Sequence, residues 1–138
     1  MNEMGLLNTA IAAAIAKQGH GDLLMITDAG FAIPRDAEVI DVSLDVNKPT
    51  VSDVLTVLRK HFSVEKIILA DQTRKTNPTF FDHISKAFGD NVEVETIDHS
   101  DLKKLSKTVK AIIRTGDFTA YGNVILVSGA GDRWFVEN

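Results

Sequence analysis

A histidine and two carboxylates bracket one short apolar run near the start of the chain. In residues 19–30, GHGDLLMITDAG, His20 and Asp22 precede the run 23–27, and Asp28 follows it. Histidine suits acid–base chemistry because its ordinary pKa lies near the working pH, and a carboxylate can orient it. Gly and Asp also mark ordinary strand boundaries. The segment therefore indicates either a site that collects both groups at one sheet edge, or a turn.

Two further polar clusters lie near expected strand ends. His99 and Lys103 stand one helical turn apart in DHSDLKK. Tyr121 and Asn123 stand at the start of the last apolar run. Each residue has a structural alternative: a helix-start histidine, a solvated lysine, or a strand-edge tyrosine whose hydroxyl stays wet. Asp28 could equally cap a turn, so none of these residues establishes a site by itself.

The elements that must position these residues alternate along the chain. We expect helices over 8–18, capped by Asn8, over 51–62, capped by Thr50 or Ser52, and from Pro78 onward, and a helix pair over 100–115. Strands are expected at 23–27, 38–42, 65–70, 92–97 and 123–128, with a loop over 28–37. This alternation predicts an α/β protein, a layered sandwich around a largely parallel sheet, whose ligand crevice lies beyond the carboxyl ends of the strands.

Composition limits the class of protein. The 138 residues fit a single domain, 1–138, and 44% hydrophobic with 25% charged residues is typical of a soluble globular chain. A net charge of −4 with interspersed signs argues against a nucleic-acid partner. The apolar start is broken by Asn8, lacks a basic leader and is too short to span a membrane, so we expect a cytoplasmic protein.

Familiar cofactor and metal patterns do not occur in the sequence. There is no cysteine, no HExxH and no dense group of histidines and carboxylates. The glycines form neither a dinucleotide nor a P-loop fingerprint, and no Gly-x-Ser-x-Gly elbow is present. We therefore expect neither a cofactor nor a metal.

Four segments, taken together and in order, resemble the RbsD/FucU family of sugar mutarotases. They are GLLN, GHGDLLMITDAGFAIP, DHSDLKK and IIRTGDFTAYGNVILVSG, which together span about Gly5 to Gly129. The resemblance implies a three-layer α/β/α sandwich with a Rossmann-like sheet. It also implies that His20 is the catalytic proton donor. The sugar-binding residues that it implies are Asp28, His99, Lys103, Tyr121 and Asn123.

The activity that the resemblance implies is interconversion of the pyranose and furanose forms of D-ribose, which supplies the sugar for ribose catabolism. Ring opening needs a base at the anomeric hydroxyl and an acid at the ring oxygen, and a histidine can serve in both directions. The family's fucose mutarotases tend to carry arginine at the position of Lys103, so Lys103 and the Ala-Ile-Pro loop, 32–34, make the resemblance stronger to the ribose branch. The alternatives are a mutarotase for another aldose such as fucose, or a non-catalytic sugar-binding or transport-accessory protein.

The resemblance also implies self-association. Members of the family form rings with sites built between neighbouring subunits, so we expect a homo-oligomer, a decamer of two pentamer rings. The alanine-rich segment 8–18 gives indirect support. Residues 130–138 run past the family's usual terminus, and we expect this extension to alter subunit contacts.

Overall fold

The computed structural model of the protein describes residues 1–137. Within this part of the chain, six strands form one sheet in the order β2-β5-β1-β6-β3-β4. Strand β6 is antiparallel to both of its neighbours, β1 and β3, whereas the other pairings are parallel. The strands are β1 (Leu23–Thr27), β2 (Val39–Asp41), β3 (Val64–Ala70), β4 (Glu93–Ile97), β5 (Ala111–Arg114) and β6 (Val124–Ser128).

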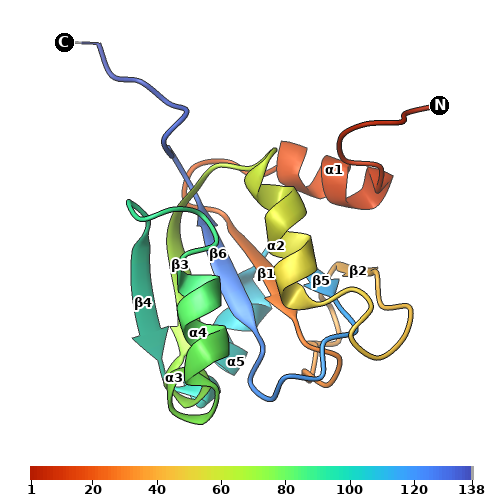
Figure 1. Ribbon diagram of the computed structural model, residues 1–138, viewed down its shortest axis with the longest axis vertical. Coiled ribbons are helices and arrows are strands. Elements are labelled where there is room, and N and C mark those ends of the chain that lie inside the picture. Colours follow the sequence, from red (N-terminus) through yellow and green to blue (C-terminus); the bar gives the residue numbers. More distant parts are fainter. Residues whose placement is uncertain (138) are drawn as a thin grey trace.

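Helices cover both faces of the sheet, as the three-layer prediction requires. Helices α2 and α4 lie on the near face in Figure 1, and α5 lies on the far face. The helices are α1 (Thr9–Ala16), α2 (Val51–Arg59), α3 (Asp71–Thr76), α4 (Pro78–Ser85) and α5 (His99–Leu105), followed by a 3₁₀ turn, Ser106–Thr108. The prediction of an α/β fold with a largely parallel sheet is confirmed.

Alternation along the strands builds a separate apolar core on each face. In β1, Leu24 and Ile26 pack into the larger core with α1, α2 and α4, whereas Met25 packs into the smaller one beneath α5. Asn8 caps α1 by accepting a hydrogen bond from the Ile11 N–H. Thr50, rather than Ser52, caps α2 in a reciprocal box with Asp53. Apolar side chains therefore pack against both faces of the sheet.

The prediction of a helix pair over 100–115 was wrong in its second half. The chain forms α5, then the 3₁₀ turn, and then strand β5, which pairs in parallel with both β1 and β2. The cause is tertiary packing: Ile112 and Ile113 are adjacent and both fully buried, one in each core. Only a strand can point neighbouring side chains into opposite layers. Helix α3 was not predicted.

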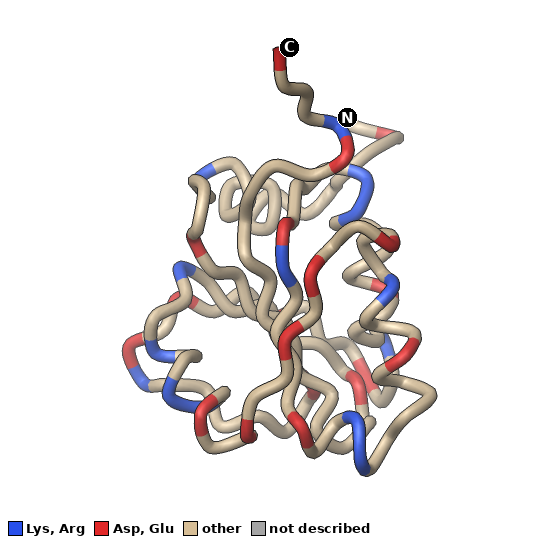
Figure 2. Tube along the Cα trace, turned by 90° about the vertical axis from the view of Figure 1, so that its left-hand side faces the viewer, with Lys and Arg blue, Asp and Glu red and all other residues tan. Residues whose placement is uncertain are grey.

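The chain continues past β6 along the outside of the fold. Arg133 donates hydrogen bonds to the carbonyl oxygens of Arg59 and Lys60, and the Trp134 indole donates to Ser63 Oγ at 3.0 Å. Acidic and basic residues are interspersed along the trace in Figure 2. In residues 1–137 no helix is both long enough and apolar enough to cross a bilayer. The effect of residues 130–138 on subunit contacts stays a prediction.

Candidate functional site

Four of the predicted site residues line one cavity at the carboxyl edge of the sheet. Asp28 follows β1, His99 and Lys103 belong to α5 beyond β4, and Tyr121 precedes β6. The cavity has a volume of about 550 Å³. Because β6 runs antiparallel, its beginning reaches the same edge as the ends of the parallel strands. The topology therefore brings together segments that lie nearly a hundred residues apart.

Asp28 organises two loops of this cavity. Its carboxylate accepts hydrogen bonds from the N–H groups of Gly30 (3.0 Å) and Gly122 (3.1 Å). Its own N–H donates to Oδ1 of the buried Asn123 at 2.9 Å. Asp28 thus caps a turn, as the structural alternative required, and also fixes the wall that carries Tyr121. The Asn123 side chain supports this wall and is not among the residues that line the cavity.

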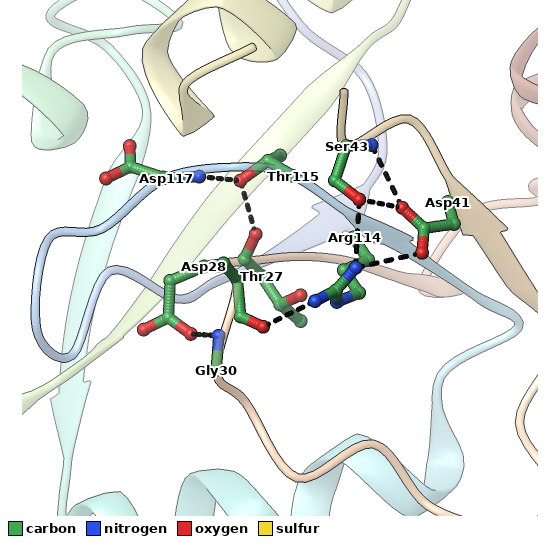
Figure 3. A network of polar contacts seen from close by, with 9 residues as sticks. Thr27, Asp28, Gly30, Asp41, Ser43, Arg114, Thr115 and Asp117 are labelled. Atoms are coloured by element: carbon green, nitrogen blue, oxygen red, sulfur yellow. Dashed lines mark hydrogen bonds and ion pairs between the residues drawn. The ribbon is translucent and has the colours of Figure 1, made fainter. Parts of the chain in front are cut away.

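Arg114 was not among the predicted site residues. It connects the loop after β1 to the end of β2 through hydrogen bonds. One guanidinium nitrogen, Nη2, donates to the carbonyl oxygen of Ala29, and the other, Nη1, donates to Asp41 and Ser43 (Figure 3). Arg114 also lines the cavity. The signal that could have found it was an arginine at the end of the short apolar run AIIR, but assigning that run to a helix hid its place at a strand end.

The wall that carries Tyr121 is also held by the unpredicted helix α3 and by Asn77, which follows it. Thr73 Oγ1 donates to the carbonyl oxygen of Tyr121 at 2.7 Å, and the Asn77 amide donates to that of Ala120 at 2.7 Å. Tyr121 itself has a φ of +57°, in the left-handed region. These two hydrogen bonds hold it there and turn its ring toward His99, with 5.0 Å between the ring centroids and an edge-to-face geometry.

His99 is held at the start of α5 by its backbone. Its N–H donates to Gln72 Oε1 at 2.9 Å, while the Gln72 amide donates to Asp98, the residue that caps the helix. Hydrogen bonds from the Ser100 hydroxyl and from Gln72 hold the pKa of Asp98 at about 2. The carboxylate that caps α5 therefore stays ionised well below neutral pH.

The His99 ring is kept neutral. Partial burial, followed by the nearby Lys103 ammonium, lowers the pKa of His99 below its ordinary value of 6.5, although Asp28 and Asp98 oppose the shift. Nδ1 is buried and has no hydrogen-bond partner within residues 1–137, so a proton placed there would be unsatisfied. A neutral imidazole can both donate and accept hydrogen bonds, which suits a ligand rich in hydroxyl groups.

We predict that acidification destabilises the fold through His99. Below pH 6.5 the unfolded chain takes up this proton before the folded chain does, so stability is full above pH 6.5 and falls from there down to the lowered pKa. Lys103→Met removes a nearby positive charge and should raise the pKa of His99. An NMR titration of the His99 ring proton in both proteins measures this, and equal titration midpoints would contradict the assignment.

His20 does not reach this cavity in the same chain. It lies in the turn before β1, at the other end of a strand whose five residues span about 16 Å at about 3.3 Å each. Its side chain is 73% exposed, and its Nε2 lies 3.4 Å from Glu65 Oε2. The hypothesis that one sheet edge collects both His20 and Asp28 is therefore wrong for a single chain, because the two residues occupy opposite ends of β1.

The cavity combines a carboxylate, an imidazole, an ammonium and aromatic rings, groups that can hydrogen-bond and pack against a small polyhydroxylated molecule. Within residues 1–137, no group of three or more histidine, aspartate or glutamate side chains is placed to hold a metal ion. The chain belongs to the RbsD / FucU transport protein family, which matches residues 1–131.

Relatives of this chain carry a common name. It is 42% identical over 132 residues to the D-ribose pyranase of Thermotoga petrophila, covering 94% of this chain and 98% of that protein. It is 45% identical over 129 residues to the D-ribose pyranase of Thermosipho africanus, with the same coverage.

Solved structures of two family members superpose on this chain. Bacillus subtilis RbsD, solved in complex with D-ribose, superposes with a TM-score of 0.88 at 37% identity, covering 94% of this chain and 98% of that one. The fucose mutarotase of Streptococcus pneumoniae, solved with L-fucose, gives a TM-score of 0.73 at 20% identity, covering 91% of this chain and 94% of that one. At that identity the second likeness concerns the fold alone.

Proposed function

We propose that the protein is a D-ribose pyranase, an isomerase that interconverts the pyranose and furanose forms of D-ribose and so supplies the sugar for its catabolism. The observation that carries the proposal is the convergence of Asp28, His99, Lys103 and Tyr121 on one cavity. The relatives of about 40% identity and the ribose-bound structure support the choice of sugar. The proposed reaction feeds sugar catabolism, and we assign it to the cytoplasm.

The reaction divides naturally among these groups. A base takes the proton of the anomeric hydroxyl while an acid protonates the ring oxygen, the bond between that oxygen and the anomeric carbon breaks, and the open aldehyde recloses through another hydroxyl. We assign the proton transfer to His20. In this scheme Asp28, His99 and Lys103 bind hydroxyl groups, Tyr121 packs against the sugar ring, and Asn123 acts through the backbone of Asp28.

This assignment requires a second subunit. His20 lies at one end of β1 and the cavity lies at the other, so a His20 that serves the cavity must come from a neighbouring copy. Phe118, which lines the cavity, is 66% exposed and is accessible to a neighbouring copy. We propose a homo-oligomer with sites at its subunit contacts, in the form of a decamer of two pentamer rings.

We expect the protein to accelerate exchange between the pyranose and furanose signals of D-ribose. Saturation-transfer NMR of the sugar, recorded with and without protein at constant pH and buffer, measures the exchange rate directly. L-Fucose in the same assay is the matched control, and its exchange should be accelerated much less. Faster exchange of fucose than of ribose would move the proposal to another aldose. Ribose binding without faster exchange would indicate a non-catalytic sugar-binding protein.

A further inference from the structure

His20 faces a carboxylate that neither the motif analysis nor the cavity includes. Nε2 of His20 lies 3.4 Å from Glu65 Oε2, with the two side chains 73% and 36% exposed. Glu65 belongs to β3, far from His20 in sequence. An exposed pair of this kind contributes little to stability. We therefore consider its effect on the orientation of the His20 ring.

The sheet is irregular at Glu65. Val64 is opposite Ser128 on β6, yet Lys66 is opposite Val127, so Glu65 is an extra residue between two paired positions. Such bulges bend a strand and re-aim a side chain, and they are frequent beside active sites. Here the bulge directs the Glu65 side chain toward the turn that carries His20.

A glycine makes room for this carboxylate. A Cβ at Gly129, just past the end of β6, would overlap the Glu65 carboxylate and lie 2.7 Å from its Cγ. The φ of Gly129 is not in the left-handed region, so backbone conformation does not require glycine here. A side chain at position 129 would therefore displace the Glu65 carboxylate from its present place.

The backbone of His20 is fixed to the same place. The Gly21 N–H donates to the Ser128 carbonyl at 2.7 Å, and the Ser128 N–H donates to the Asp22 carbonyl at 2.9 Å. The Asp22 carboxylate closes the turn on the Gly19 N–H and pairs with Lys110 at 2.6 Å. The turn that carries His20, the bulge at Glu65 and Gly129 thus lie together at one end of β6. Together they set the distance between His20 and Glu65.

We propose that Glu65 is a positioning residue for His20, an inference that rests on the proposed catalytic role of this histidine. At 3.4 Å the carboxylate contacts Nε2, which fixes the ring orientation and favours the tautomer with its proton on Nε2. Nδ1 is then the nitrogen presented to the sugar. This follows the general pattern in which a carboxylate orients a working imidazole.

The test is a comparison of maximal exchange rate with sugar affinity. Glu65→Gln should lower the maximal ribose exchange rate about tenfold, within the range of coupling between contacting groups, and leave the half-saturating ribose concentration nearly unchanged. Gly129→Ala should have the same effect because the added methyl displaces the carboxylate. If that variant does not fold, Glu65→Asp, one methylene shorter, replaces it. Glu95→Gln, which removes the carboxylate paired with Lys66 on the adjacent strand, is the control and should keep the wild-type rate.

The outcomes separate this inference from the function on which it rests. If His20→Ala slows exchange while Glu65→Gln and Gly129→Ala both keep the wild-type rate, Glu65 has no positioning role and the proposed function stands. If His20→Ala keeps the wild-type rate, the proposed role of His20 fails, and this inference fails with it. If the Glu65 and Gly129 variants change affinity rather than maximal rate, the pair shapes the sugar site and the positioning role is overturned.

Discussion

Replacing His20 by alanine should lower the catalysed ribose exchange rate by about 10²- to 10⁴-fold, the usual contribution of a general acid–base group. The fold should be unaffected, because this side chain is 73% exposed and pairs only with another partly exposed group. Ribose affinity should change little, since the groups proposed to bind hydroxyls line the cavity at the other end of β1. Saturation-transfer NMR gives the rate, and a ribose titration gives the affinity.

A mixed assembly tests where His20 works. Co-expressed His20→Ala and Lys103→Met chains should recover part of the exchange activity, because some contacts pair an intact His20 with an intact cavity on the neighbouring chain. Co-expressed His20→Ala and His20→Gln chains are the matched control and should recover none. Activity that stays absent in purified mixed assemblies would show that His20 does not serve a neighbour's cavity.

The sequence was most informative where one local rule governed the structure. The run 23–27 is a strand with the predicted limits, because an apolar run between Gly-rich and Asp-rich turns has few other solutions. Helix α2 begins after Thr50, whose side chain and that of Asp53 cap it reciprocally. In each case the deciding interaction lies within a few residues.

Prediction failed where distant contacts decide the structure. Helix α3, DQTRKT, has no apolar period, and within it only Thr73 is buried, so its packing against α4 and its hydrogen bond to the loop before β6 sustain it. Strand β5 is only four residues long and follows a helix. Its apolar residues therefore fit the pattern of a second helix, which is what the sequence predicts there. Its pairing with β1 and β2 is invisible in the sequence.

The same distinction applies to the site. Each predicted site residue does lie near a strand or helix end, which local patterns can indicate. Whether two such ends face each other depends on strand direction, and here the antiparallel β6 brings Tyr121 to Asp28. The separation of His20 from Asp28 has the same origin, since a strand keeps its two ends apart whatever their chemistry. In the proposed mechanism a neighbouring copy of the chain therefore supplies the His20 that serves each cavity.

The second large effect that we predict is on stability, at Asp117. This residue is 3% exposed, and its two carboxylate oxygens accept hydrogen bonds from the Val51 N–H at 2.9 Å and the Thr119 N–H at 2.8 Å. Val51 is the first residue of α2, so the carboxylate also lies at the positive end of that helix. The Asp117 carbonyl oxygen accepts from the Ala29 N–H, which links this anchor to the cavity loop.

Asp117→Asn should therefore lower the free energy of unfolding by about 1 to 3 kcal/mol. The new amide group keeps one acceptor oxygen and places its NH₂ against a buried N–H, so one of two backbone donors loses its partner. Urea unfolding at a fixed protomer concentration measures the change, because assembly makes stability depend on concentration. Asp53→Asn, at the same helix start but accepting only from the exposed Thr50 N–H, is the matched control and should cost less, about 0.5 to 1 kcal/mol. Equal losses in the two variants would mean that burial of the Asp117 carboxylate adds nothing to stability.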